Sequence, residues 1–159
     1  MTIERMGLML LLLIALCAAA RQPDPVPSLY AIRLRPGQDL RQEIERFAKQ
    51  ENLQAGFIAT CVGSLDRTTL RLANQEGVTT FPGCMEIVSL VGTLSPDGVH
   101  LHLSVADETG AMVGGHLVQG CRVYTTAELV VGEARELQFR RVVDPQTTYH
   151  ELAVEARAD

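Results

Sequence analysis

The chain is poor in aromatic and basic side chains. It has no tryptophan, its phenylalanines and tyrosines make up 4% of the residues, and its one lysine is Lys49. The formal net charge is −5, and the pI is about 5.4. Lys and Arg form no run anywhere in the sequence, whereas nucleic-acid binders usually carry a basic patch that contacts the phosphates. The composition therefore argues against a phosphate-binding surface.

Common catalytic fingerprints are missing as well. No phosphate-binding glycine loop, dinucleotide-binding motif or Ser-His-Asp arrangement is evident, and neither are internal repeats or low-complexity tracts. The sequence thus names no reaction and leaves open whether the chain is an enzyme. The apolar fraction of 47% is typical of a globular domain.

Cysteines are few and lack the spacing of a metal site. Cys17 lies in an apolar N-terminal stretch, and Cys61, Cys84 and Cys121 follow without a CxxC pair. Three cysteines after the N-terminal stretch is an odd number for an exported protein. One pair can form a disulfide and leave a spare thiol. We expect instead that each is a small buried apolar residue.

Residues 1–20 have the pattern of a secretory signal peptide. Arg5 precedes an apolar run over residues 6–16, and three small alanines end the segment at Ala20. The apolar run is too short for a membrane-spanning helix. We therefore expect cleavage after Ala20, secretion or export to the periplasm, and no stable membrane span. A lipoprotein anchor at Cys17 is the alternative.

The rest of the chain reads as a short leader and one domain. Residues 21–28 contain three prolines, which predicts a stiff, exposed leader. Residues 29–155 are long enough to bury one hydrophobic core and show no sign of a second domain.

One helix is clear in this domain. Apolar residues recur at i, i+4, i+7 and i+8 from Leu40 to Ala48, which makes a single narrow apolar stripe. Asp39 is placed to cap its start, with Gln42 three positions later, and Asn52 is placed to end it. A narrow stripe is typical of a helix that lies on one face of a sheet.

Nearly everything else reads as extended strand. The expected strands cover residues 29–34, 57–62, 69–73, 85–94, 99–106, 111–119, 121–132, 137–143 and 148–154. Turns of hairpin length, rich in Gly, Pro, Asn and Asp, separate several of them. We therefore expect an α+β fold, with a mainly antiparallel β-sheet and one principal flanking helix.

Three of the four histidines carry the strongest chemical signal. His100 and His102 lie two residues apart in an expected strand, so they project from the same face. His116 follows a short hairpin later. Imidazole nitrogens gathered in this way are typical ligands of zinc and other divalent metals.

The turn between the two strands decides whether these residues meet. If Glu108, Thr109 and Gly110 form a three-residue loop, His102 lies directly opposite His116, and glycine takes the left-handed position of the loop. A two-residue loop turns His116 to the other face. The prediction of a three-histidine site therefore depends on the odd register.

Simpler interpretations of the histidines stay open. An HxH pair on a strand is often two half-exposed polar residues, and the cluster can be a remnant within a purely structural domain. A cupin barrel also uses an HxH pair, but it needs a glutamate four or five residues later, where this chain has Ala106 and Asp107. The glycines before His116, Gly114 and Gly115, favour close approach of a ligand or another backbone.

Two stretches of the sequence carry a family resemblance. Residues 83–94 read GCMEIVSLVGTL, and residues 101–117 read LHLSVADETGAMVGGHL. They resemble the GxFEILSLSGT and HxHxSLAdxxGxxxGGHL motifs of the plants-and-prokaryotes conserved domain, abbreviated PPC or PCC. The resemblance extends over residues 29–143, and Met85 stands where the family usually has phenylalanine.

The resemblance implies a single α+β domain that assembles as a homotrimer. It also implies a bound divalent metal, zinc, on the histidine cluster of bacterial members, which corresponds to His100, His102 and His116. Plant members place an AT-hook before the domain and bind DNA. This chain has no AT-hook and no basic tract. DNA binding and a non-catalytic oligomerisation or interaction module are the alternatives to an exported metal-binding trimer.

A few further residues are weak candidates for a site. Glu86 can act as a general base or orient a histidine, although a structural hydrogen bond is the simpler interpretation. Arg33 and Arg71 can bind an anionic ligand, although salt bridges are commoner roles for arginines. Asp107 and Glu108 lie near the histidines in sequence but read as turn residues.

Overall fold

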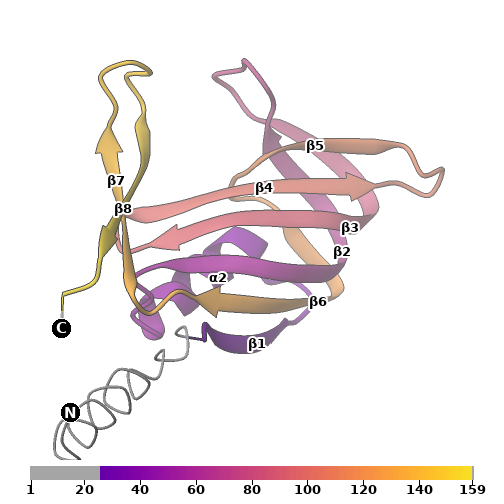
Figure 1. Ribbon diagram of the computed structural model, residues 1–159. Helices are drawn as coiled ribbons and strands as arrows, with labels where there is room; N and C mark the ends of the chain where they lie inside the picture. The colour runs from indigo at the N-terminus through magenta and orange to yellow at the C-terminus, as the bar shows by residue number, and fades with distance from the viewer. Residues whose placement is uncertain (1–25, 159) are drawn as a thin grey trace, which may run out of the picture.

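A computed structural model describes residues 26–158 of the chain. The predicted signal peptide and most of the predicted leader lie outside this range. The described elements are β1 (Ser28–Leu34), α2 (Leu40–Gln50), β2 (Gly56–Arg71), β3 (Thr79–Ser95), β4 (Gly98–Ala106), β5 (Met112–Leu117), β6 (Arg122–Glu133), β7 (Leu137–Val143) and β8 (His150–Ala156). The expected α+β fold with one principal helix is confirmed (Figure 1).

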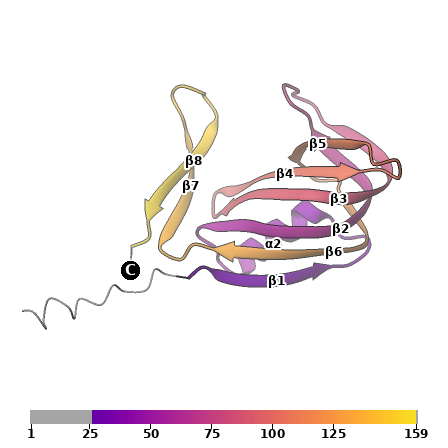
Figure 2. The same ribbon diagram turned by 45° about the vertical axis from the view of Figure 1, so that its right-hand side comes forward.

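Six strands form one antiparallel sheet in the order β1-β6-β2-β3-β4-β5. The C-terminal end of β2 also pairs with β5, so that Leu70 lies opposite Leu117 and Arg71 lies opposite His116. The sheet therefore curls back on itself at that end, as both ribbon views show (Figures 1 and 2). This closure brings the strand that carries His116 against two neighbours at once.

Helix α2 lies on the inner face of the sheet. Asp39 caps it, since its side chain accepts a hydrogen bond from the Gln42 amide at 3.0 Å, as the sequence predicted. Leu40 and Ile44 are fully buried against the sheet. Asn52, in the left-handed region with φ 52°, follows the last turn and ends the helix.

The expected strands 57–62 and 69–73 are one continuous strand, β2. The sequence GSLD between them reads as a break, but the strand passes through it with register shifts near Gly63 and Leu65. Gly63 has φ 137°, and a Cβ atom there would lie 2.1 Å from the Thr126 carbonyl oxygen. A local bulge at glycine thus lets one strand continue where two separate strands were expected.

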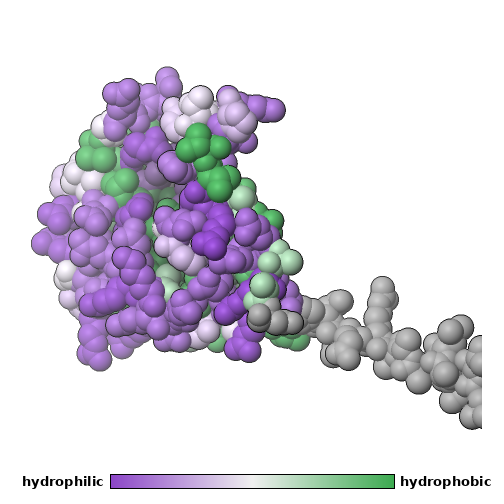
Figure 3. All heavy atoms as spheres, turned by 90° about the vertical axis from the view of Figure 1, so that its left-hand side faces the viewer, coloured by the Kyte–Doolittle hydropathy of each residue, from purple (hydrophilic) through white to green (hydrophobic). Residues whose placement is uncertain are grey.

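Strands β7 and β8 form a separate two-stranded sheet that stands at one end of the main sheet (Figures 1 and 2). The Phe139 amide, which donates to the Gln54 carbonyl at 2.9 Å, ties its base to the main body. Seen from the side of this hairpin, the surface is largely hydrophilic with separate hydrophobic patches (Figure 3). Exposed apolar residues on the hairpin are Val142, Val143, Tyr149, Leu152 and Val154.

The three cysteines of the described region differ in burial. Cys61 and Cys121 are buried free thiols, as expected, but Cys84 is exposed on β3, so the expectation for it was wrong. Burial raises the pKa of Cys61 to about 12 and that of Cys121 to about 11. No disulfide links cysteines within residues 26–158. In the same range no helix is long and apolar enough to cross a membrane.

Candidate metal centre

Strand β4 separates its polar and apolar side chains cleanly. His100 and His102 are exposed, whereas Leu101, Leu103 and Val105 are at most 1% exposed and pack in the core. The alternation fixes the orientation of both histidines, because a slip of one residue would bury two imidazoles and expose three apolar side chains.

The loop between β4 and β5 has the predicted register. The Asp107 amide donates to the Ala111 carbonyl and the Gly110 amide to the Asp107 carbonyl, both at 3.0 Å. Gly110 has φ 82°. His102 consequently lies opposite His116 in the ladder. The three-residue loop predicted from the sequence is therefore confirmed.

Asp107 holds this loop and does not face the histidines. Its Oδ1 accepts hydrogen bonds from the Thr109 amide at 2.8 Å, the Thr109 hydroxyl at 2.7 Å and the Ala111 amide at 3.0 Å. These hydrogen bonds to Thr109 are the main reason that its pKa lies below the ordinary value. Asp107 is a turn residue, as the simpler interpretation held.

The three histidines converge on one point of the outer face. The ligand nitrogens of His100, His102 and His116 all lie within 4.8 Å of one another. His102 Nε2 and His116 Nδ1 are 3.2 Å apart, and the rings of His100 and His116 stack with 5.1 Å between centroids. Two nitrogens on one tetrahedral zinc ion lie about 3.4 Å apart. The spacing of the three nitrogens is thus compatible with one shared metal ion.

Partial burial and nearby positive charge lower the pKa of two of these imidazoles, His100 and His116. Partial burial lowers the pKa of His100 below 6.5, and the positive charge of Arg141 lowers it further. Burial also lowers the pKa of His116, with Arg71 as the next cause. A neutral imidazole offers the lone pair that a metal needs, so the surroundings favour the ligating form.

Two glycines let neighbouring backbones approach the histidines. A Cβ atom on Gly115 would lie 2.7 Å from the Arg71 carbonyl oxygen, so β5 can lie this close to β2 only because the residue is glycine. Gly92 has φ 145°, and a Cβ atom there would lie 2.0 Å from the His100 carbonyl oxygen. The prediction of a close backbone approach beside His116 is confirmed at Gly115.

The hairpin β7–β8 supplies a wall beside the cluster that the sequence did not reveal. A cavity of about 280 Å³ lies between the histidines and this hairpin, lined among others by Arg141, Glu151 and Leu152. The Arg141 Nη2 donates to the Thr93 hydroxyl at 2.6 Å. Nothing in the local pattern around these residues marks them, since tertiary packing alone brings them to the site.

The weaker candidates fall in different places. Arg71 lies in register with His116, beside the cluster. Arg33 lies on edge strand β1, where its Nε donates to the Thr126 hydroxyl at 3.0 Å. Glu86 is exposed on β3 in register with Ala106, four residues along β4 from His102. Of the three, only Arg71 is brought to the histidines within one chain.

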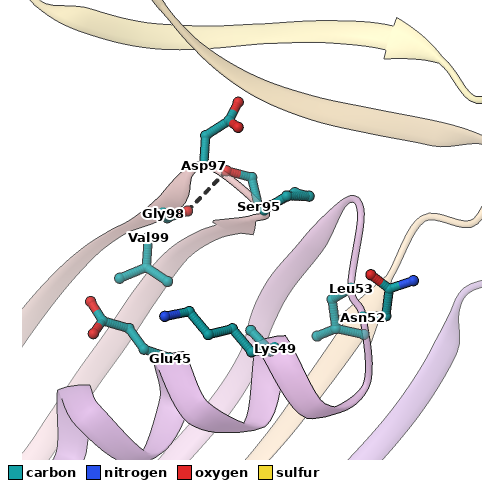
Figure 4. Close-up of a pocket in the computed structure, with 10 residues that line it drawn as sticks. Glu45, Lys49, Asn52, Leu53, Ser95, Asp97, Gly98 and Val99 are labelled. Carbon is teal, nitrogen blue, oxygen red and sulfur yellow. Dashed lines mark hydrogen bonds between the residues drawn. The ribbon is translucent and has the colours of Figure 1, made fainter.

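A larger cavity, of about 370 Å³, lies elsewhere, between the C-terminal half of α2 and the β3–β4 turn. Figure 4 shows Glu45 and Lys49 rising from α2 toward this turn, where the Ser95 hydroxyl donates to the Gly98 carbonyl at 2.9 Å. Glu45, Lys49 and Asp97 line it, but within residues 26–158 only the three histidines form a group that could hold a metal ion. The histidine cluster is the better candidate site.

The same sequence that builds this site matches a known family. The model of the Plants and Prokaryotes Conserved (PCC) domain matches residues 22–135. The chain belongs to the PCC family. The match includes all three histidines and ends before the hairpin β7–β8, so the hairpin lies outside the part that defines the family.

Curated relatives contain the PCC-like region as part of a longer protein. The chain is 52% identical over 146 residues to the bifunctional protein GlmU of Synechococcus sp. (strain JA-3-3Ab), an alignment that covers 89% of the chain and 24% of the relative. It is 32% identical over 116 residues to AT-hook motif nuclear-localized protein 2 of Arabidopsis thaliana, covering 65% of the chain and 33% of the relative. The chain thus spans a third or less of either relative.

Solved structures share the PCC fold. A protein of Salmonella cholerae-suis (Salmonella enterica) is 44% identical with a TM-score of 0.82, and the match covers 84% of the chain and 96% of the neighbour. A protein of Archaeoglobus fulgidus, described as metal-containing, is 25% identical with a TM-score of 0.71, covering 81% and 95%.

Proposed function

We propose that this PCC-domain protein binds one divalent metal ion, zinc, through His100, His102 and His116. The observation that carries the proposal is the convergence of three imidazoles, whose ligand nitrogens lie within 4.8 Å of one another on a solvent-facing surface. Carboxylates that would favour magnesium or calcium do not join the donor set. Nitrogen donors alone suit zinc and its transition-metal neighbours.

The metal would have one position open to an external ligand. Zinc bound by three neutral histidines polarises an oxygen ligand and lowers the pKa of bound water. The chain's own residues orient the histidines. Gly92 lets the His100 backbone approach, Gly115 lets the Arg71 backbone approach, and the Asp107 loop sets the register of β4 and β5. Metal binding follows from this arrangement, whereas a specific reaction does not. The Archaeoglobus neighbour, described as metal-containing, supports the metal.

Elemental analysis of the purified protein tests the proposal. We expect about one zinc ion per chain in the wild type and none in His102→Ala, because two imidazoles hold zinc far more weakly than three. His150→Ala is the matched control, since His150 is exposed on β8 and belongs to no cluster within the described residues. Metal-free wild-type protein of full stability would instead support a non-catalytic interaction module.

We also propose that the protein is exported and works as a homotrimer. The N-terminal signal pattern supports export. Assembly is supported by the exposed apolar residues Val142, Val143, Tyr149 and Val154 of the hairpin β7–β8, because a two-stranded sheet is marginally stable unless something packs against it.

DNA binding is the second candidate, favoured by the relationship to the Arabidopsis protein that is named for its AT-hook motif. It would give an affinity that falls steeply with salt. The net charge of −5 and the single lysine of this chain argue for the metal-binding proposal.

A further inference from the structure

The cavity beside the histidines is walled by the part of the chain that follows the family match. Arg141, Glu151 and Leu152 of the hairpin β7–β8 face His100 and His102 across about 280 Å³. The family model ends at residue 135. The hairpin thus lies outside the segment that the family model matches.

Positive charge would exceed negative charge in this cavity once a divalent metal ion is bound. Three neutral imidazoles leave the two positive charges of a divalent ion uncompensated. Arg141 and Arg71 add to these, since both act electrostatically on His100. Among the described residues, Glu151 is the one carboxylate that lines the cavity. Partly buried charge needs a partner, so the site as a whole favours an anion.

Arg141 is held in place and still free to bind. Its Nη2 donates to the neutral Thr93 hydroxyl at 2.6 Å, and its backbone amide donates to Asp97 Oδ2 at 3.0 Å. Within residues 26–158 no carboxylate lies within 4.0 Å of its guanidinium, whereas Arg140 lies 3.9 Å from Asp97. A guanidinium has five N–H donors in a fork that matches a carboxylate. Most of these donors of Arg141 are available to a ligand.

Apart from the histidines and the charged groups, the lining is largely apolar, and the cavity is open to solvent. Val91 and Leu152 line the cavity together with Gly92. The side chains of Val91 and Leu152 are 53% and 40% exposed in the single chain, which leaves apolar surface for a ligand to cover. About 280 Å³ is at the small end of ligand sites. The occupant that fits is a small molecule with an acidic head and a short apolar tail.

We propose that this cavity binds a small organic carboxylate, with its head between the histidine-bound metal and the Arg141 guanidinium and its tail against Val91 and Leu152. The inference rests on the proposed metal function and names the class of ligand that the open metal position accepts. Glu151 limits the affinity, because its negative charge opposes that of the ligand.

Calorimetric titration of butyrate into the zinc-loaded protein tests the inference. We expect saturable binding to the wild type, and binding about tenfold or more weaker to Arg141→Gln, because a charge-assisted hydrogen-bonded pair is lost. Arg140→Gln is the matched control: it removes the same charge one residue away, from an arginine that contacts Asp97, and it should bind butyrate like the wild type.

A second variant separates loss of binding from damage to the hairpin. Glu151→Gln should bind butyrate more tightly than the wild type, since it removes the opposing charge, whereas a merely damaged cavity would bind more weakly. Butyramide, which has the same shape and no charge, should give no comparable binding. Equal butyrate affinity in wild type and Arg141→Gln, or no butyrate binding to zinc-loaded wild type, overturns the inference.

Zinc content, measured in the same samples, distinguishes the two proposals. If wild type and Arg141→Gln both carry zinc and neither prefers butyrate, the carboxylate site is wrong and the metal site stands. If the wild type carries no zinc, the metal proposal fails, and the carboxylate site built on it fails as well.

Discussion

Each histidine of the cluster is defined by its neighbours as much as by its own ring. Buried leucines on alternate positions of β4 hold His100 and His102 outward, and Gly115 lets His116 lie beside Arg71. The nearby arginines and partial burial lower the pKa of His100 and of His116. A lowered pKa favours the neutral imidazole, which is the form that binds a metal.

The thiols give a prediction at the same scale. In a chain that begins at residue 21, we expect a thiol reagent at pH 8 to label one cysteine rapidly, Cys84, because it is exposed. Cys61 and Cys121 are buried, with pKa values of about 12 and 11, so neither forms the reactive thiolate at that pH. Mass spectrometry of the labelled peptides checks this. Rapid labelling of all three in the native protein would contradict the burial described above.

Among the elements, the short strand β5 is important for the site because it carries His116. Of its six residues, five pair with β4 and two with β2, and His116 pairs with both strands, so it is fixed from two sides. The loop held by Asp107 sets its register, and the apolar Leu117 anchors its end in the core. An error of one residue here would remove a ligand from the cluster without changing the fold class.

Close packing of β5 on β2 predicts a difference between two adjacent glycines. Gly115→Ala should lower the free energy of unfolding by about 1–3 kcal/mol, because its Cβ atom would lie 2.7 Å from the Arg71 carbonyl oxygen and β5 must move. Zinc affinity should fall with it. Gly114→Ala is the control, since its nearest contact, the Leu103 carbonyl oxygen, is at 3.2 Å. Urea unfolding and zinc titration compare the two, and equal effects would contradict a specific role for Gly115.

The hairpin β7–β8 lies outside the main sheet. It pairs only with itself among the described elements, yet it supplies Arg141 and Glu151 to the cavity beside the histidines. A short hairpin attached at its base is the kind of element that can vary while the sheet stays constant.

For the whole molecule, export and assembly lead to one prediction. Expressed in full length in a bacterium and recovered from the periplasm or the medium, the protein should give a native mass three times that of a chain that begins at Arg21. The exposed apolar residues of the hairpin need cover, and the signal pattern predicts cleavage after Ala20. Native mass spectrometry measures both the number of chains in the assembly and the mass of each chain, which shows whether residues 1–20 have been removed. A monomer, or a chain that keeps its first residues and stays in the cytoplasm, would contradict them.

Local rules in the sequence were enough for the helix, most strands and the three histidines. The cap at Asp39, the alternation around His100 and His102, and the glycine of a three-residue loop each act within a few residues, so their outcome can be read from the chain. The two motifs that resemble the PCC domain identified the family, which the family model confirms.

Tertiary structure decided what lies at long sequence separation. The fusion of two expected strands into β2, the pairing of Arg71 with His116 and the approach of Arg141 to His100 depend on how the sheet curls and where the hairpin β7–β8 packs. No local pattern encodes these contacts, because they follow from burying the whole core at once. The sequence by itself determined which rings can hold a metal, and the packing of distant strands decided what else faces it.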